Sequence, residues 1–419
     1  MPRVLILADD LSGAADCGIA CVHAGLSAMV SLGNPRDTDA AADVLSLDAH
    51  TRVLTAEAAA DRMRHLVLQY ASDISTLLFK KIDSTLRGHL GTELAAVLEA
   101  RRTVVPNAVA IMAPAFPSNG RTTVGGMHYV HGSPLHESDF WKKEGMQGEA
   151  WIAEMLQGSG LRVGLLDLAT VRKSREKLSV ATTELAASND VLVCDAETAA
   201  DLAAIAEIAA ELGDRAVWVG SAGLAQHLAK AARLTPAGEV EPPVLPKTSG
   251  SVLFVIGSAS RTTKHQAAIL LSSAAIHGIV VPPEVLLAGP TGSDWNAFTK
   301  ELCDSVRHGE DVILLCGSDP EVAAADRPRL SDALGEMTST LRGRVGAIVA
   351  SGGETARKVL DGWGVQTMDL HGELEKGVPI STAVVNGSRS LTVITKAGDF
   401  GQPYTLLHCR EWLTQTRVS

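Results

Sequence analysis

Short runs of apolar residues recur along the chain, and each run ends in small or polar residues. The clearest runs span residues 4–7, 191–194, 217–219, 252–256, 312–316, 347–350 and 391–394. Runs of this length are typical of strands that are buried on both faces of a sheet. Between many of them lie stretches such as 199–212, in which apolar residues recur three and four positions apart, as on a half-buried helix. This alternation predicts an α/β protein whose mostly parallel sheets are covered by helices.

The length of the chain predicts two such domains, because 419 residues exceed the size at which single cores stop growing. A segment rich in proline, with glycine and serine, lies near residues 234–250 and is typical of a stiff connector. We therefore expect a first domain at 1–235, a linker at 236–249 and a second domain at 250–419. Ligands of parallel sheets bind beyond the carboxyl ends of the strands. We expect ligand sites at those ends and in the cleft between the domains.

The overall charge disfavours polyanionic partners. The chain carries 37 basic and 48 acidic residues, so its formal charge is −11. Such a surface repels nucleic acid and anionic membranes, although a local cluster of Arg and Lys can still bind a small anion. The six cysteines are scattered, as is typical of reduced thiols. With no signal-peptide pattern and no apolar stretch as long as a membrane span, we expect a cytoplasmic protein.

Two polar segments of the first half follow apolar runs. Asp9 and Asp10 could hold a substrate hydroxyl, bind Mg²⁺ through water, act as a base, or simply cap a helix. The segment KKIDSTLRG at 80–88 combines cations with hydroxyls and a carboxylate, which suits a carboxylate or phosphate ligand. A capped helix start with a charged face is the alternative. Arg52 is a further candidate for binding a carboxylate, whereas His128 and His131 lack metal-ligand spacing and are expected at a loop surface.

Three loops of the second half follow strands and contain glycine with serine or threonine. They are GSAS at 257–260, GGET at 352–355 and TKAGDFG at 395–401. Glycines let backbone N–H groups approach an anion, and a helix N-terminus favours negative charge. The spacing of a P-loop is absent, so the pattern indicates another kind of phosphate cradle. The convergence of three such loops on one crevice is what we expect of a nucleotide site.

Seven segments in this order resemble the four-carbon acid sugar kinase family. They are ADDLSGA at 8–14, KKIDSTLRG at 80–88, APAFPSNGRTT at 113–123, GSAGLA at 220–225, GSASRTTKHQ at 257–266, GGETA at 352–356 and TKAGDFG at 395–401. The likeness covers nearly the whole chain. It implies an N-terminal domain that binds a sugar acid, a C-terminal domain that binds ATP, and transfer of phosphate to the terminal hydroxyl of D-threonate, D-erythronate or a 3-oxo-tetronate.

The resemblance also implies which residues form each site. The acid site would contain Asp9, Arg52, Lys81, Ile82, Asp83 and Ser84. The nucleotide site would contain Ser258, Gly352, Gly353, Glu354, Thr355 and Gly398. We expect D-threonate to be the substrate, because TKAG at 395–398 looks closest to members of that type.

A mechanism follows as a hypothesis. Arg52 and Lys81 anchor the substrate carboxylate, Asp9 or Asp83 orients or deprotonates the far hydroxyl, and Mg²⁺ bridges the ATP phosphates. Closure of the two domains would exclude water. A non-catalytic sensor of sugar acids is the rival interpretation, and a dehydrogenase is disfavoured because no ordered GxGxxG follows a strand. A homodimer is compatible with either.

Overall fold

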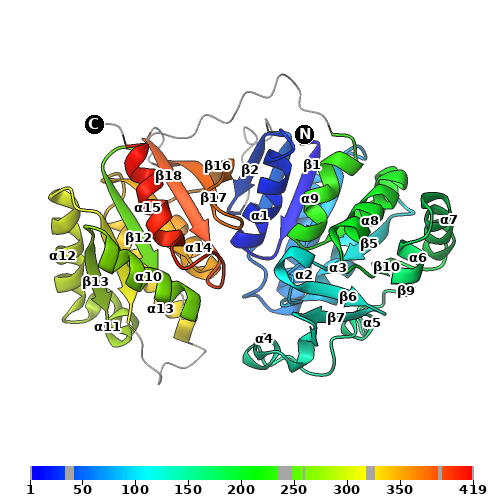
Figure 1. Ribbon diagram of the computed structural model, residues 1–419, viewed down its shortest axis with the longest axis horizontal. Coiled ribbons are helices and arrows are strands. Elements are labelled where there is room, and N and C mark those ends of the chain that lie inside the picture. The colour runs from blue at the N-terminus through cyan, green and yellow to red at the C-terminus, as the bar shows by residue number, and fades with distance from the viewer. Residues whose placement is uncertain are drawn as a thin grey trace. The chain divides into compact units, whose positions relative to one another are not determined.

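The computed structural model describes residues 2–33, 42–234, 248–257, 260–317, 326–385 and 389–417. The chain divides into two compact units (Figure 1). The first comprises Met1–Met29 and Arg36–Val240, and the second comprises Val30–Pro35 and Glu241–Ser419. Most of the expected linker at 236–249 lies outside the described residues.

The first unit contains a parallel sheet of seven neighbouring strands. Their order is β3 (Val44–Asp48), β1 (Val4–Ala8), β4 (Leu77–Lys81), β11 (Ala216–Gly220), β5 (Val109–Ala113), β10 (Val191–Cys194) and β9 (Val163–Leu166). The strands are rich in buried Val, Ile and Leu because helices cover both faces. A small antiparallel sheet joins β6 (Arg121–Val124), β7 (Met127–Val130) and β8 (Ser133–Pro134).

Two groups of helices cover the parallel sheet of the first unit. In one group α1 (Leu11–Val22) packs on α9 (Ala222–Ala231), which packs on α8 (Ala199–Glu211). In the other group α2 (Ala56–Tyr70) packs on α3 (Leu90–Arg102). The remaining helices are α4 (Asp139–Lys143), α5 (Ile152–Met155), α6 (Leu168–Val171) and α7 (Arg175–Ala186).

The second unit has a mixed sheet with a parallel part and an antiparallel part. The order is β13 (His277–Val281), β14 (Val312–Cys316), β12 (Ser251–Ile256), β15 (Val345–Ser351), β18 (Arg389–Lys396), β17 (Pro379–Val385) and β16 (Thr367–Glu373). The first five strands are parallel, and β17 is antiparallel to both of its neighbours β18 and β16. Its helices are α10 (Arg261–Ser273), α11 (Pro283–Ala288), α12 (Trp295–Arg307), α13 (Arg327–Ser339), α14 (Gly353–Gly362) and α15 (Thr405–Gln415).

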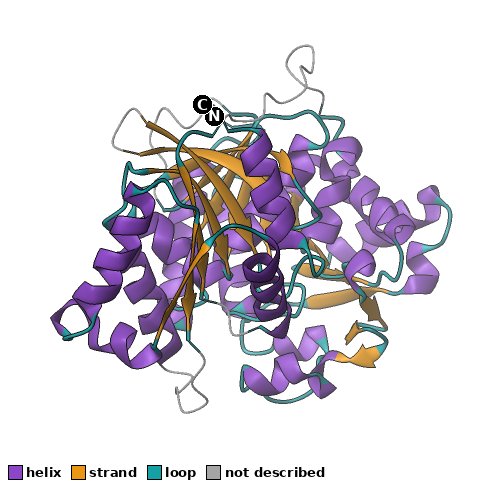
Figure 2. Ribbon diagram, turned by 60° about the vertical axis from the view of Figure 1, so that its left-hand side comes forward, coloured by secondary structure: helices purple, strands orange, loops and turns teal. Residues whose placement is uncertain are grey.

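The α/β architecture predicted from the apolar runs is confirmed, with helices, strands and loops distinguished in Figure 2. Each of the seven runs forms a strand. Neighbouring strands bring candidate residues together: β1 pairs with β4 so that Ala8 lies opposite Lys81, just before Asp9 and Ile82. In the second unit Ile256 lies opposite Ser351, which lies opposite Lys396. Among the described helices, none is both long and apolar enough to cross a membrane.

Candidate active site

The two adjacent aspartates at the end of β1 have different roles. Asp10 is the N-cap of α1, and its Oδ1 accepts a hydrogen bond from the Gly13 N–H at 3.0 Å. Asp9 is buried, and its Oδ2 accepts from Arg52 Nε at 3.0 Å and Nη2 at 2.6 Å. The helix-cap interpretation therefore fits Asp10. Asp9 is left as the candidate for chemistry.

Arg52 is the cation at the centre of this cluster. Besides Asp9, it donates through Nη1 to Asp10 Oδ2 at 3.0 Å, and its Nη2 lies 3.6 Å from Asp83 Oδ1. Burial raises the pKa of Asp9, but the positive charges of Arg52, Lys81 and Lys80 outweigh it, so this pKa lies below its ordinary value. Asp9 is therefore ionised at neutral pH, held by Arg52 through one of its two oxygens.

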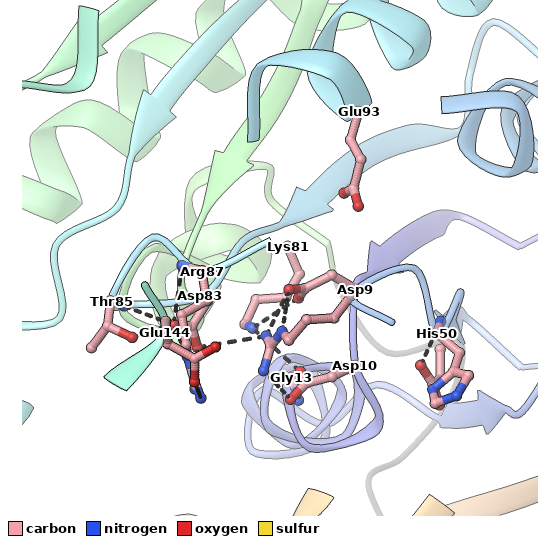
Figure 3. A network of polar contacts seen from close by, with 12 residues as sticks. Asp9, Asp10, Gly13, His50, Lys81, Asp83, Thr85, Arg87, Glu93 and Glu144 are labelled. Carbon is pink, nitrogen blue, oxygen red and sulfur yellow. Dashed lines mark hydrogen bonds and ion pairs between the residues drawn. The ribbon is translucent and has the colours of Figure 1, made fainter. Parts of the chain in front are cut away.

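Lys81 has unused hydrogen-bonding capacity. Its side chain is only 7% exposed, and its Nζ lies 3.9 Å from both Asp9 Oδ1 and Asp10 Oδ1, beyond hydrogen-bond distance (Figure 3). Across the described part of the chain, no residue accepts a hydrogen bond from this ammonium or donates one to the buried Asp9 Oδ1. A ligand hydroxyl could donate to Asp9 Oδ1 and accept from Lys81.

The absence of a side chain at Gly13 leaves space for the Lys81 ammonium. A Cβ atom at position 13 would lie 2.2 Å from Lys81 Nζ and 2.8 Å from Asp10 Oδ1. The ammonium therefore rests over the first turn of α1, where a side chain on residue 13 would displace it.

Asp83 is fully engaged by its own segment. Arg87 donates to it through Nε at 2.8 Å and Nη2 at 3.0 Å, and Thr85 donates from both its N–H and its hydroxyl (Figure 3). Burial raises the pKa of Asp83, yet Arg87 and Arg52 hold it well below its ordinary range. A carboxylate with so many donors is a weak base, so the geometry favours a positioning role for Asp83.

Ile82 and Ser84 enter this region through their main chains. The Ile82 N–H donates to the Gly220 carbonyl at 2.9 Å, and the Ser84 carbonyl lies 2.9 Å from His128 Nε2. The surface position expected for His128 is wrong, because this residue lies within β7 and is completely buried. Burial lowers the pKa of His128 to about 4, so the ring is neutral. Since a carbonyl only accepts, Nε2 carries the proton and Nδ1 accepts from the Thr123 hydroxyl at 3.1 Å.

Lys80 and Lys81 are the last two residues of β4. Lys80 points to the other side of the strand from Lys81. Its Nζ lies 2.7 Å from Glu93 Oε2 and donates to the Lys81 carbonyl at 3.0 Å, and both side chains of this ion pair are almost fully buried. No partner for Lys80 was predicted, because Glu93 lies on the next helix, α3. This pair fixes the end of the strand that carries Lys81.

The glycine-containing loops of the second unit lie at the ends of adjacent strands, as expected. Gly352 has a φ of 102°, which favours glycine, and its N–H donates to the Lys396 carbonyl at 2.8 Å. Gly353 starts α14, and Thr355 in its first turn lies so close to Gly257 that a Cβ there would be 2.2 Å from its Oγ1.

The third loop is tied to α10, which follows the first one. The Gly398 carbonyl accepts from the Ser260 hydroxyl at 2.8 Å and from the Thr263 hydroxyl at 2.6 Å. The loops after β12, β15 and β18 are thus in mutual contact. The predicted residue Ser258 lies outside the described residues.

The described residues contain no group of three or more His, Cys, Asp or Glu side chains that could hold a metal ion by themselves. The open Asp9 Oδ1 is the one carboxylate oxygen of the cluster around Arg52 that is both buried and without a donor among the described residues. Magnesium in phosphoryl-transfer sites is commonly held by one or two carboxylates together with the phosphates of the substrate. The residues present are compatible with that arrangement.

Two family models match the chain. Residues 4–228 match the family described as the sugar-binding N-terminal domain, and residues 253–406 match the nucleotide-binding C-terminal domain. The D-threonate kinase of Cupriavidus necator is 39% identical over 418 residues, which cover 99% of each chain. The D-threonate kinase of Bordetella bronchiseptica is 32% identical over 429 residues, which cover 100% of this chain and 99% of that protein.

A crystal structure of a Haemophilus influenzae protein has the same fold, with a TM-score of 0.73 at 21% identity over 98% of this chain and 100% of that one. Both domain families lie in the expected order, and the full-length identity to the Cupriavidus necator enzyme extends through both. The chain therefore belongs to the four-carbon acid sugar kinase family.

Proposed function

We propose that this protein is an ATP-dependent kinase that phosphorylates the terminal 4-hydroxyl of D-threonate. D-erythronate and a 3-oxo-tetronate are the alternative acceptors. The preference for D-threonate is supported by the names of the Cupriavidus necator and Bordetella bronchiseptica relatives. The remaining support comes from the chemistry of the cluster around Arg52.

The observation that carries the proposal is the open pair formed by Asp9 Oδ1 and Lys81 Nζ. Both groups are buried, they lie 3.9 Å apart, and neither has a hydrogen-bond partner among the described residues. An alcohol is both a donor and an acceptor, so it can satisfy both groups at once. Buried polar groups without partners are costly, and the bound substrate would remove that cost.

Asp9 is the proposed catalytic residue. It orients the acceptor hydroxyl and takes its proton, while Arg52 keeps the other carboxylate oxygen fixed. Asp83, which is itself held by Arg87, lies 3.6 Å from Arg52 Nη2 and helps to position this guanidinium. Ile82 and Ser84 contribute the backbone that carries Asp83 into the site.

Arg52 and Lys81 remain the proposed cations for the substrate carboxylate, since the three donors of the Lys81 ammonium allow it to bind the carboxylate as well as the acceptor hydroxyl. Arg52 donates to Asp9 twice and to Asp10 once, which uses three of the five guanidinium N–H groups. The two others are available for a carboxylate. Because Arg52 is already paired, the acid would be bound by directed hydrogen bonds more than by excess positive charge.

ATP is proposed to bind the loops of the second unit, through Ser258, Gly352, Gly353, Glu354, Thr355 and Gly398. Mg²⁺ would bind the phosphates of ATP. When bound, it neutralises charge on the phosphate oxygens. The protein's own contribution is to position the hydroxyl and to accept its proton.

A substrate panel tests this function. The purified protein is incubated with ATP, Mg²⁺ and each of several four-carbon acids, and ADP release is followed to obtain kcat/KM. We expect the highest kcat/KM with D-threonate. Highest kcat/KM with D-erythronate or a 3-oxo-tetronate would identify that acid as the substrate instead. Tight binding of these acids without ADP release would favour a non-catalytic sensor of sugar acids.

Two further parts of the proposal concern the protein in the cell. We propose a cytoplasmic location and a homodimer. Cell fractionation tests the first, and light scattering coupled to size-exclusion chromatography tests the second.

A further inference from the structure

The buried side chain of Lys396 belongs to no function assigned so far. It is 1% exposed and lies at the end of β18, directly before the loop formed by residues 397–401. Its Nζ lies within hydrogen-bond distance of four oxygens: Thr263 Oγ1 at 3.1 Å and the carbonyls of Ala397 at 3.0 Å, Gly398 at 3.2 Å and Phe400 at 3.1 Å. An ammonium has three donors and no acceptor, so it orients the carbonyls around it.

The orientation of these carbonyls determines where the loop's N–H groups point. In a trans peptide the C=O and the N–H point in opposite directions, and the described chain has no cis peptide bond. With three carbonyls turned toward Lys396, the N–H groups of Gly398, Asp399 and Gly401 point away from it. Within the described residues, none of these three N–H groups has an acceptor. Successive outward N–H groups form the kind of concave donor set that binds anions.

Other donors hold the same loop from α10. Gln266 donates through Nε2 to the carbonyls of Phe400 at 3.1 Å and Gln402 at 2.8 Å, and Thr263 donates to the Gly398 carbonyl. All the donors contributed by α10 are polar and uncharged. Lys396 is the charged group, and its ammonium binds carbonyls from both ends of the loop, those of Ala397 and Phe400.

We propose that Lys396 is a positioning residue. By binding the carbonyls of the 397–401 loop, it orients the N–H groups of this loop toward the phosphates of the nucleotide. This inference rests on the proposed binding of ATP to the second unit. Lys396 acts through the backbone and does not touch the nucleotide itself. Without its ammonium, the three carbonyls would lose their common partner and the N–H groups their common direction.

Protonation of Lys396 is part of this role, since only the ammonium has three donors. Burial lowers the pKa of Lys396 to about 8. Two other titratable groups act on it: Cys409 of α15, whose thiol pKa burial raises to about 12, and the exposed Asp399 of the loop. A phosphate group is fully ionised above about pH 7, because its second pKa is about 6. A loss of nucleotide affinity above pH 8 would therefore come from the protein.

The test compares ADP with adenosine in isothermal titration calorimetry on the full chain with Mg²⁺. We expect Lys396→Met to weaken ADP binding by about tenfold or more, because charge-assisted hydrogen bonds that order the phosphate donors are lost. Adenosine, which lacks phosphates, should bind as to the wild type. Lys300→Met, on the exposed side of α12, is the matched control and should bind both ligands normally.

A second measurement follows the pH dependence of ADP binding. Wild-type affinity for ADP should fall as the pH rises from 7 to 9.5, whereas Lys396→Arg, whose guanidinium stays charged, should show no such fall. The inference is overturned if Lys396→Met binds ADP normally, if it loses ADP and adenosine equally, or if wild-type affinity is constant to pH 9.5. A wild-type protein that binds no ADP at pH 7 would instead contradict the proposed function.

Discussion

Asp9 Oδ1 and Lys81 Nζ face each other at 3.9 Å, and across the described residues neither makes a hydrogen bond. The other oxygen of Asp9 is held by Arg52 at 2.6 Å. One half of the carboxylate is therefore fixed, and the other half is open for a ligand. The first two predictions follow from this pair.

Replacing Asp9 by Asn should abolish proton acceptance while keeping the shape of the side chain. We expect kcat to fall by roughly 10²- to 10⁴-fold, which is the usual contribution of a positioned general base. Asp10→Asn is the matched control, because it removes the neighbouring charge but asparagine caps helices as well as aspartate. Its kcat should stay within about tenfold of the wild type. Equal losses in the two variants would remove Asp9 from its assigned role.

Gly13→Ala should separate stability from activity. Alanine favours helix over glycine by up to about 1 kcal/mol, which offsets the cost of shifting Lys81 and the Asp10 side chain, so the free energy of unfolding should change little. The new Cβ would occupy a position 2.2 Å from Lys81 Nζ and displace the ammonium. We expect kcat/KM for the acid to drop at least about tenfold.

A double-mutant cycle checks that this loss runs through Lys81. In a Lys81→Met background, Gly13→Ala should cause no further decrease in kcat/KM, because the displaced group is already absent. Additive losses would show that Gly13 acts by another route.

The fold was predictable because strands and their ends follow from local patterns. Buried parallel strands are continuous apolar runs, and their carboxyl ends carry the residues that bind ligands, so the positions of Asp9 and of the loop at 352–355 could be read along the chain. The helix cap and the catalytic interpretation of the two aspartates could not be separated in that way. Asp10 caps α1 and Asp9 binds Arg52, and this distinction depends on the position of Arg52, which lies in a separate loop.

The residues that the sequence did not single out act through distant partners. His128 carries no local signal, because its role is to donate to the Ser84 carbonyl from another sheet. Lys396 belongs to the predicted motif TKAGDFG, but its buried position involves a contact with Thr263 of α10, which lies far away in the sequence. Such contacts arise from the order of strands in the sheet, which no short stretch of sequence specifies.

The buried ion pair between Lys80 and Glu93 leads to a prediction about stability. Lys80→Met alone leaves the Glu93 carboxylate buried without its partner, so we expect a loss of about 3–5 kcal/mol in the free energy of unfolding. Lys80→Met combined with Glu93→Leu should recover more than half of this loss, because no unpaired charge remains. Urea denaturation followed by circular dichroism measures both. A double variant less stable than Lys80→Met would contradict the assignment.

Neutral His128 should make stability depend on pH. Its pKa is about 4 in the folded protein and about 6.5 in the unfolded chain, so the unfolded chain binds more protons between these values. The stabilisation is complete above pH 6.5 and is lost as the pH falls toward 4. Between pH 7 and 4.5 this residue should account for about 2–3 kcal/mol.

Urea denaturation across this pH range measures the effect. His128→Asn should be less stable at pH 7 but should lose less stability on acidification than the wild type. The pKa of the half-buried His371 is also lowered, so His371→Asn serves as the comparison and should change the pH dependence less. A His128→Asn variant with the wild-type pH dependence would disprove the neutral assignment.

The most direct measurement is phosphorus–proton correlation NMR of the product formed from D-threonate, ATP and Mg²⁺. The account predicts a phosphate ester whose phosphorus couples to the two protons of the terminal carbon. Coupling to a single proton at another carbon, or inorganic phosphate as the only new phosphorus signal besides ADP, would contradict it.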